Sequence, residues 1–536
     1  MTRTTHRGGA RAFALAIAML TLALAAPAAA QAGYVQRSGT NLTLDGSQFR
    51  FVGHNNYQLT SDRTANQCGR VIGDATLGSI LDDAKNSGAK VIRTWFFQSY
   101  YRNAGNSYTP FDRVLNAAAA RGLKVIPVLV NHYSDCEPSA GNEKDEGFYD
   151  YGYKQASWGY PQSYRDFAYN VAVRYKNNDT VAFWQLVNEA ETSYNDQQSC
   201  NTSLDANGHQ RSANVLRTFA DDMATLLKAG DPNHLVSLGT IGAGQCGAGG
   251  AEYQYVHSGS VDLCEYHDYG DPTHSLPDDG YNRLKQRIDQ CSTIGKPLFI
   301  GEAAIVADAA DNGSSSGSIT SDSVQRRAGF IDAKMTAAFA NGVDGYALWE
   351  KIPDATNSSY NLNNGRYGIG PSSLFSDPTN SVTTQQAASF GGGAGTVRSG
   401  FEDGTAGGWQ VAWGTVSLAN STTQAWGGFK SLALGVSGAG YPAVRTLSTS
   451  GAGVGTKITY RVYKPASAPS SVGVKPYVSN NGWAQTFGSD VSLSYGWNTV
   501  IFTVPAGVST PLQAIGLQVN NGGGWTGSLY LDDVSW

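Results

Sequence analysis

Residues 181–189 read VAFWQLVNE, a short run of apolar, mostly β-branched and aromatic residues that ends on Asn188 and Glu189. This length and composition are typical of a strand that is buried on both faces. Seven similar runs occur between residues 49 and 353, and amphipathic segments such as 212–230 and 323–342 lie between or after them. The eight runs are FRFVGHNNY (49–57), AKVIRTWFF (89–97), KVIPVLVNH (124–132), VAFWQLVNE (181–189), LVSLGTIG (235–242), VDLCEYHDY (261–269), KPLFIGEAA (296–304) and VDGYALWEK (343–351). Eight strands that alternate with helices predict an α/β fold whose parallel sheet closes into a (β/α)8 TIM barrel.

An open, doubly wound sheet is the alternative arrangement of such runs. No GxGxxG or Walker sequence follows the first run, so nothing favours a nucleotide-binding sheet. In a closed barrel the chemistry gathers where the strands end, at the C-terminal face. Polar or aromatic residues end seven of the eight runs: Asn55, Asn56, Arg93, Trp95, His132, Asn188, Glu189, His267, Tyr269, Glu302 and Trp349.

The first 32 residues have the pattern of a secretory signal. Arg3, Arg7 and Arg11 precede an apolar run over 12–26, and small residues follow it. Cleavage after Ala30 or Ala32 fits the preference for small residues. A membrane anchor is the alternative, but the apolar run is shorter than the ~20 residues that a bilayer requires. We therefore expect a secreted, extracellular protein without a membrane span.

Charge argues against a nucleic-acid partner. The chain has 38 Lys and Arg against 43 Asp and Glu, a net charge of -5, and no basic block that would neutralise a run of phosphates.

Six cysteines, all within the first 300 residues, suit disulfides in an exported protein: Cys68, Cys136, Cys200, Cys246, Cys264 and Cys291. The pairing stays open, and sequential pairs such as Cys264 with Cys291 are the simplest arrangement. No CxxC spacing indicates zinc.

The composition changes after a glycine-rich stretch, SFGGGAG at 389–395. Residues 397–536 contain seven of the eleven tryptophans but only seven Lys and Arg and five Asp and Glu, and short strand-like runs alternate with Gly, Ser and Asn turns. We expect a signal over 1–32, a barrel over 33–385, a linker over 386–396 and a β-sandwich over 397–536.

Two carboxyl groups carry the predicted chemistry. Hydrolysis of a glycosidic bond with retention needs two of them ~5 Å apart, one protonated and one ionised. Glu189 ends the fourth run and Glu302 the seventh, and these strand ends face each other across a barrel mouth. The alternatives are that each is a solvated loop carboxylate or half of an ion pair, or that the nearby Glu191 or Glu350 acts instead.

Over residues 34 to about 360 the chain resembles glycoside hydrolase family 5, the retaining (β/α)8 hydrolases. The resemblance implies that Glu189, preceded by Asn188, is the acid/base and that Glu302 is the nucleophile. Arg93 and Tyr269 would contact the nucleophile, and His267 is paired with Tyr269 after the sixth strand.

The same resemblance assigns sugar-binding roles. Asn188 would bind the sugar 2-hydroxyl, Trp349 would form a platform in the cleaved subsite, and His132 would lie on that subsite. Asn56 and Trp95 are further candidates for substrate contact. The chain departs from the family pattern in having Ala190 and Glu191 after the acid/base and Ala303 and Ala304 after the nucleophile, which leaves the substrate open.

The stretch QRSGTNLTLDGSQFRFVGHNNYQL (36–59) resembles the start of endo-β-1,4-mannanases of that family. We therefore expect a monomeric endo-acting enzyme on β-mannan or glucomannan that needs no cofactor for catalysis. The alternatives are an endo-β-1,4-glucanase, an exo-acting β-glycosidase, a non-catalytic polysaccharide-binding protein, and a metal-dependent hydrolase that uses His54, His132 and His267.

The C-terminal region opens GFEDGTAGGW (400–409) and ends YLDDVSW (530–536), and it resembles jelly-roll carbohydrate-binding modules. The resemblance implies that Glu402 and Asp533 hold a structural calcium, and the alternative is two surface acids. Trp483 and Trp525 lie in glycine- and asparagine-rich loops, so we expect them to be sugar platforms rather than core residues.

Overall fold

The computed structural model describes residues 1–2, 32–61, 72–137, 143–157, 159–194, 199–276, 283–352, 366–370, 377–389, 397–399, 401, 404–424, 426 and 430–536. Most of the predicted signal, as well as Cys68 and Glu402, lies outside these residues. In the part of the chain that the structure describes, no helix has both the length and the apolar character needed to cross a membrane.

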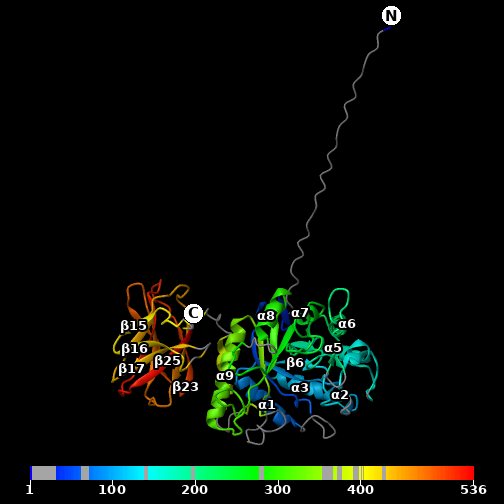
Figure 1. The fold of residues 1–536 in the computed structure, drawn as a ribbon, viewed down its shortest axis with the longest axis horizontal. Helices are drawn as coiled ribbons and strands as arrows, with labels where there is room; N and C mark the ends of the chain where they lie inside the picture. The colour runs from blue at the N-terminus through cyan, green and yellow to red at the C-terminus, as the bar shows by residue number, and fades with distance from the viewer. Residues whose placement is uncertain are drawn as a thin grey trace.

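All eight predicted strands are present and form one parallel sheet, in the order β10-β7-β6-β5-β4-β13-β12-β11. A parallel bridge between Ser237 and Leu263 joins the two ends of that order, so the sheet is closed (Figure 1). This confirms the TIM barrel. The strands are β4 (Phe51–Asn55), β5 (Val91–Trp95), β6 (Lys124–Val128), β7 (Phe183–Gln185), β10 (Leu235–Ser237), β11 (Cys264–Asp268), β12 (Leu298–Ala303) and β13 (Gly345–Leu348).

Helices surround the barrel (Figure 1), and the longer ones bury apolar side chains such as Leu81, Val114 and Leu216 in the barrel core. The two helical segments expected at 212–230 and 323–342 are the long helices α6 and α9, of 20 residues each. The helices are α1 (Asp74–Asn86), α2 (Gln98–Asn103), α3 (Thr109–Ala119), α4 (Glu146–Asp150), α5 (Tyr164–Tyr175), α6 (Arg211–Gly230), α7 (Glu252–His257), α8 (Leu284–Thr293), α9 (Ser321–Ala340) and α11 (Thr379–Ser389), with a 3-10 turn at Gly152–Lys154. The short strands β8 (Ser193–Tyr194) and β9 (Ser199–Cys200) form a separate hairpin.

Apolar side chains seal the amino end of the barrel. A small sheet of β1 (Val35–Ser38), β2 (Asn41–Leu44) and β3 (Ser47–Gln48) packs Val35 and Leu42 against the first residues of the strands. Phe51 fills the space beside Gly345, where a Cβ atom would stand 2.1 Å from its ring. With this end closed by packing, the polar side chains gather at the opposite end.

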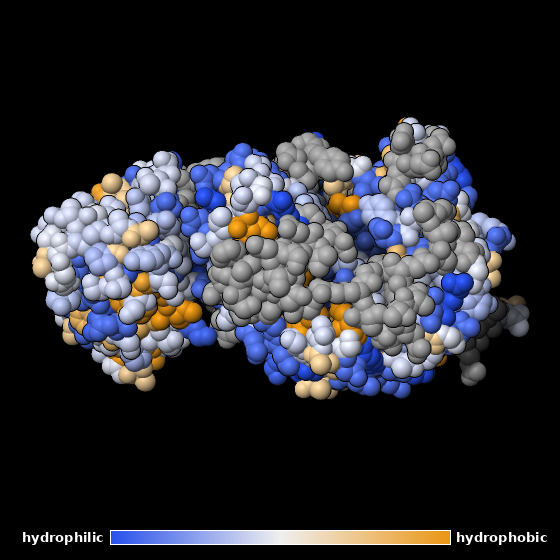
Figure 2. Space-filling view, turned by 90° about the horizontal axis from the view of Figure 1, so that it is seen from below, coloured by the Kyte–Doolittle hydropathy of each residue, from blue (hydrophilic) through white to orange (hydrophobic). Residues whose placement is uncertain are grey.

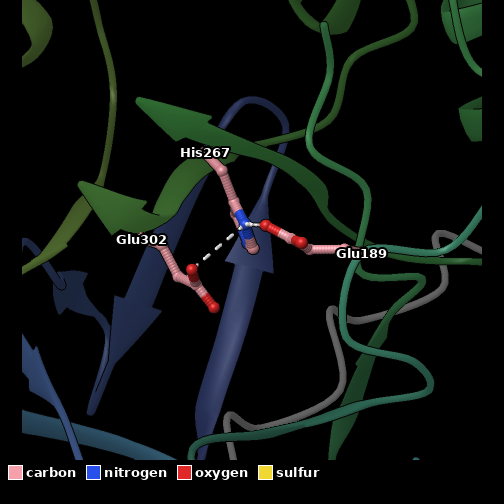
Figure 3. A group of neighbouring side chains, drawn as sticks. All are labelled: Glu189, His267 and Glu302. Atoms are coloured by element: carbon pink, nitrogen blue, oxygen red, sulfur yellow. Dashed lines mark hydrogen bonds and ion pairs between the residues drawn. The ribbon is translucent and has the colours of Figure 1, made fainter. Parts of the chain in front are cut away.

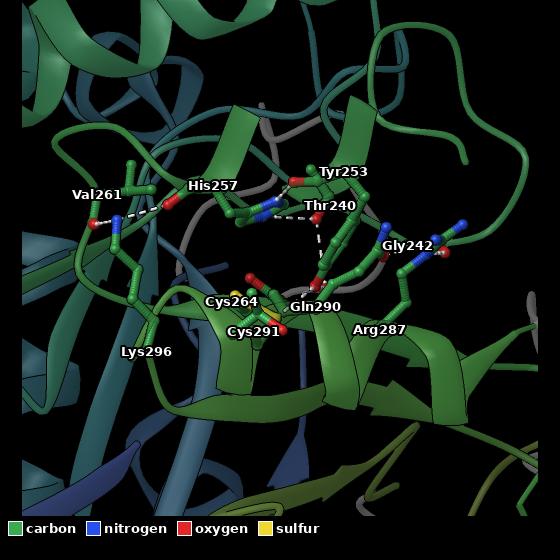
Figure 4. Close-up of a disulfide and its surroundings, with 12 residues drawn as sticks. Thr240, Gly242, Tyr253, His257, Val261, Cys264, Arg287, Gln290, Cys291 and Lys296 are labelled. Carbon is green, nitrogen blue, oxygen red and sulfur yellow. Dashed lines mark hydrogen bonds between the residues drawn. A yellow bond between two sulfur atoms is a disulfide. The ribbon is translucent and has the colours of Figure 1, made fainter. Parts of the chain in front are cut away.

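Two disulfides lie in the described part of the barrel. Cys264 of β11 is bonded to Cys291 of α8, as the simplest pairing predicted (Figure 4). Cys200 is bonded to Cys246, also a sequential pair, which ties β9 to the loop after β10. Cys136 is disulfide-bonded as well.

Residues 397–536 form the expected β-sandwich, with two antiparallel sheets around a separate apolar core. One sheet has the order β16-β17-β25-β19-β23 with β14 beside β25, and the other has the order β15-β18-β24-β20-β21 with β22 beside β20. The space-filling view shows a paler, less strongly hydrophilic surface here than on the barrel (Figure 2). The strands are β14 (Val397–Ser399), β15 (Trp409–Trp413), β16 (Val416–Ser421), β17 (Ser431–Val436), β18 (Ala443–Thr446), β19 (Lys457–Lys464), β20 (Gly473–Ser479), β21 (Gln485–Phe487), β22 (Val491–Ser492), β23 (Gly496–Thr503), β24 (Ala514–Asn520) and β25 (Gly527–Ser535).

The last helix of the barrel contacts the sandwich. Helix α11 ends at Ser389, so the linker expected to start at 386 begins inside this helix. Thr499 Oγ1 on β23 donates to Gln385 Oε1 on α11 at 2.9 Å.

The bond between Cys264 and Cys291 should stabilise the barrel, because it closes a loop with a sequence separation of 27 residues. We predict that the double variant Cys264→Ala/Cys291→Ala loses about 3 kcal/mol of unfolding free energy, from the chain entropy that the cross-link removes. Guanidinium unfolding monitored by barrel tryptophan fluorescence measures it. An unchanged midpoint and slope would show that the bond adds no constraint.

Candidate active site

Glu302 is buried in β12 at the carboxyl end of the barrel and is held by two donors. Arg93 Nη1 donates to its Oε1 at 2.6 Å, and the Tyr269 hydroxyl donates to its Oε2 at 2.7 Å. Burial alone would raise the pKa of Glu302, but the charges of His267 and Arg93 and the hydrogen bond from Tyr269 outweigh it, so its pKa lies below the usual value. Glu302 is therefore kept ionised.

Arg93 is fully buried, and its guanidinium donates four hydrogen bonds to side chains of the site. Besides Glu302, Nη1 donates to Asn55 Oδ1 at 2.9 Å, Nε donates to Gln185 Oε1 at 2.8 Å, and Nη2 donates to Asn188 Oδ1 at 2.6 Å. Its partners come from β4, β7, β12 and the segment after β7. One planar group thus fixes the relative positions of several strand ends.

Glu189 lies on the segment that follows β7, and its backbone is in the left-handed region with φ 58°. This costs a non-glycine residue about 1 kcal/mol. The neighbouring loop comes very close there, because a Cβ at Gly239 would lie 1.7 Å from the Val187 carbonyl oxygen. The Glu189 side chain lies in the barrel mouth beside His267 and Tyr133.

His267 lies between the two glutamates, as Figure 3 shows. Its Nδ1 is 2.7 Å from Glu189 Oε1 and 3.6 Å from Glu302 Oε2. Burial acts to lower the pKa of His267, but the surrounding carboxylates, Glu302 foremost, raise it to about 9. One atom each of Glu189, His267 and Glu302 lie within 4.8 Å of one another. That separation of the carboxyl groups suits a retaining glycosidase.

An aromatic group lines the mouth beside these residues. Trp349 stacks on Tyr57 with ring centroids 5.8 Å apart, and it is tilted against Trp95 at 5.7 Å. Trp95 lies under the Arg93 guanidinium at 4.9 Å and is almost wholly buried. Trp95 therefore supports Arg93 and Trp349, while Trp349 keeps 8% of its surface exposed.

His132 and Asn56 are both buried, and their side chains contact protein groups. His132 Nδ1 is 3.3 Å from the Tyr149 hydroxyl, and burial together with the Lys144 charge lowers its pKa to about 3. Asn56 donates to the Lys351 carbonyl and accepts from the Gln58 backbone, so its side chain braces the loop after β4.

Residues to which the sequence analysis gave no role complete the site. They are Asn55, Gln185 and Glu265, which face Arg93 or His267, and Tyr133, which faces Glu189. Side chains alternate between the two faces of a strand, and this alternation could have predicted that Asn55, Gln185 and Glu265 point toward the site. Asn55 is in register with Arg93, and Glu265 precedes His267 by two residues.

The three histidines of the metal hypothesis do not converge. His54 Nε2 is 3.1 Å from Ser87 Oγ, His132 faces Tyr149, and His267 faces carboxylates. Among the described residues the one set with metal-like spacing is Glu189, His267 and Glu302, and Arg93 and Tyr269 already occupy the oxygens of Glu302. The proposed calcium pair has no structural description, since Glu402 lies outside the described residues.

The two candidate platforms of the sandwich differ in exposure. Trp483 is 48% exposed, and the Arg445 guanidinium lies 5.0 Å from its ring. Trp525 is half-buried against the apolar core, and a Cβ at Gly527 would lie 2.2 Å from its ring. The loop therefore folds Trp525 back onto the sandwich, and its ring is less available than that of Trp483.

The hydrogen bond from Tyr269 should hold down the pKa of Glu302. We predict that Tyr269→Phe raises this pKa, because the ionised form loses a donor that only the charged carboxylate fully uses. Carboxyl ¹³C NMR titration of glutamate-labelled protein measures it, with the Glu302 signal identified by its loss in Glu302→Gln. A Glu302 pKa that stays in place would mean that Arg93 and His267 suffice.

Comparison with known proteins identifies the family. A family model described as cellulase (glycosyl hydrolase family 5) matches residues 45–344. Mannan endo-1,4-beta-mannosidase A of Podospora anserina is 25% identical over 337 residues, which cover 55% of this chain and 81% of that protein. The enzyme of the same name from Hypocrea jecorina is 25% identical over 376 residues, 62% of this chain and 79% of that protein. The solved endo-beta-1,4-mannanase from Thermotoga petrophila aligns with 88% of this chain and 98% of its own, at 18% identity and a TM-score of 0.47. Since the family match spans 300 of 536 residues (45 to 344), more than half of the chain, this protein belongs to glycosyl hydrolase family 5.

Proposed function

We propose that this protein hydrolyses β-1,4-linked mannan or glucomannan with retention of configuration, using Glu302 as nucleophile and Glu189 as acid/base. The observation that carries the proposal is the placement of these two carboxyl groups within 4.8 Å around His267, with only Glu302 held by Arg93 and Tyr269. The substrate class is supported by relatives that carry the name mannan endo-1,4-beta-mannosidase.

In the first step the ionised Glu302 attacks the anomeric carbon while Glu189 protonates the departing glycosidic oxygen. The bond from sugar to leaving group breaks, and a covalent glycosyl ester with Glu302 forms. Arg93 and Tyr269 withdraw electron density from the Glu302 oxygens but keep the carboxylate pointed into the mouth, so the attack needs no reorientation.

In the second step Glu189, now ionised, removes a proton from water, which attacks the anomeric carbon and releases Glu302. Asn188 donates one amide hydrogen to Asn131 Oδ1 at 3.0 Å, which leaves its second hydrogen for the sugar 2-hydroxyl. Trp349, which keeps 8% of its surface exposed, contacts the sugar ring. No cofactor enters either step, in keeping with the family.

The three parts of the chain have different proposed roles. We propose that residues 1–32 export the protein, that the barrel cleaves the polysaccharide outside the cell, and that residues 397–536 hold the enzyme on its substrate. A tethered module raises the local concentration of substrate without changing the chemistry. Trp483, with its exposed ring, is the proposed platform.

The roles of the two glutamates predict different behaviour of their variants. We expect Glu302→Ala and Glu189→Ala each to lower turnover of mannan by about 10³-fold or more. Azide should restore both on an activated aryl β-mannoside, since this small anion fits the space of the lost carboxylate. Glu302→Ala should give the inverted α-glycosyl azide, and Glu189→Ala the retained β-glycosyl azide.

Glu191→Gln and Glu350→Gln serve as controls, because both are neighbouring carboxylates without a place in the two steps. Wild-type turnover on mannan by Glu302→Ala or Glu189→Ala, or azide products of the opposite configuration, would refute the assignment. Product profiles on mannan, glucomannan, cellulose and xyloglucan separate mannanase from glucanase and endo from exo action; inactivity on all four would reject the proposed activity itself.

Removal of the exposed platform should weaken polysaccharide binding. We predict that Trp483→Ala binds insoluble mannan about tenfold less tightly, as expected when a stacked ring is lost. The full chain carrying Glu302→Gln is used, so that the substrate stays intact. Tyr495→Ala, which removes another exposed aromatic ring of the sandwich, is the matched control. Equal losses in both variants would argue against a specific platform.

A further inference from the structure

Glu265 is a third glutamate inside the barrel, and the two-carboxyl reaction does not use it. It lies in β11 two residues before His267, so both side chains leave the same face of the strand. Its side chain is fully buried. A buried carboxylate is stable only with charged or hydrogen-bonding partners, so its contacts indicate what it does.

The contacts of Glu265 lead directly to the active site. Its Oε1 is 3.2 Å from His267 Nε2 and 3.8 Å from Arg93 Nε, and its Oε2 accepts from Ser237 Oγ at 2.9 Å. The side chain fills the space over Gly301, where a Cβ atom would stand 2.0 Å from Oε1. The residue before Glu302 is thus a glycine that makes room for Glu265.

The charges of the cluster show why a third carboxylate matters. With every group ionised, Glu189, Glu265 and Glu302 carry three negative charges, while Arg93 and the His267 imidazolium carry two positive ones. The fully ionised site therefore has a charge of −1, and one added proton makes it neutral. Without Glu265 the same proton would leave a buried site with a charge of +1, which a low-dielectric interior disfavours.

The nearby tyrosines and His257 add no charge to this balance. Burial raises the pKa of Tyr133, Tyr269 and Tyr253, so these hydroxyls stay neutral, and the Tyr253 hydroxyl donates to the Glu265 carbonyl. Burial lowers the pKa of His257 to about 3, so it is uncharged near neutral pH. Glu191 lies beyond Glu189, with its carboxylate 3.7 Å from His132 Nε2.

We propose that Glu265 is a positioning residue whose buried charge lets His267 stay protonated while Glu189 also carries the proton that it gives to the leaving group. His267 Nε2–H donates to Glu265, which fixes the ring so that Nδ1–H points at Glu189. The inference rests on the proposed function, in which Glu189 is the general acid. Glu265 acts through His267 and touches no substrate.

The test is Glu265→Gln, which keeps the shape and an acceptor for His267 but removes the charge. The change is read from the pH at which the acid form of the site is lost, which limits the basic side of the profile. We expect the basic limb of the kcat/KM profile on mannan to move down by one pH unit or more. Turnover of aryl mannosides with good leaving groups, which need little acid assistance, should fall far less.

Glu265→Asp retains the charge and should restore most of the basic limb. Asp344→Asn is the matched control, because it removes a buried carboxylate at the sealed amino end and should leave the profile in place. A basic limb in Glu265→Gln within 0.3 units of wild type would overturn the inference. The function itself would still stand if the wild type hydrolyses mannan with a bell-shaped profile.

A measurement on the wild type covers the case in which Glu265→Gln does not fold. In ¹⁵N-histidine NMR of the full chain at pH 7, His267 should have both ring nitrogens protonated, with its signals identified by their loss in His267→Asn. A neutral His267 ring would overturn the inference, whatever the enzyme's activity.

Discussion

The buried guanidinium of Arg93 is the group on which the rest of the site depends. Taking a charge out of water is costly, and hydrogen bonds to polar partners offset the cost. Arg93 has four such partners, Asn55, Gln185, Asn188 and Glu302, which come from strand ends that are adjacent only in a closed barrel. Loss of Arg93 would leave Glu302 as a buried carboxylate without its strongest hydrogen-bonded counter-ion. The contact between Arg93 and Glu302 therefore matters both for the stability of the barrel end and for the charge of Glu302.

Backbone clearance is the second requirement, and glycines provide it. Gly239 lets the loop after β10 approach the Val187 carbonyl, two residues before Glu189, whose backbone is in the left-handed region. Gly301 leaves room for Glu265 beside the nucleophile. At the other end of the barrel, Gly345 admits the ring of Phe51, which belongs to the apolar seal. Bulky side chains therefore fill the amino end of the barrel, whereas glycines at the carboxyl end leave space for the residues of the site.

The sequence was sufficient for the barrel, because eight buried runs alternate with amphipathic helices, and for the two glutamates, because each ends such a run. The sequence was insufficient where moving by one position along a strand reverses the direction in which a side chain points. Asn56 was chosen over Asn55, yet Asn55 is in register with Arg93 and points inward. Trp483 and Trp525 lie in similar loops, and only the folded turn shows that Trp525 rests on the core. Glu265 looked like an ordinary strand residue because its partners lie 28, 172 and 2 positions away, at Ser237, Arg93 and His267.

The environments of Glu302 and Glu189 differ in the way that the two roles proposed for these chemically identical side chains require. Glu302 receives hydrogen bonds from a guanidinium and a phenol, which favour its charged form. Glu189 is more exposed, with 14% of its side chain accessible against 5% for Glu302, and it touches His267 and Tyr133. His267 contacts both glutamates, so its own charge would pull both toward ionisation unless something opposed it. Glu265 lies at the other ring nitrogen, Nε2, and its negative charge offsets the effect of the imidazolium charge on the two glutamates. A retaining glycosidase needs one carboxyl of each kind, and here the difference is built from the partners of one histidine and one arginine.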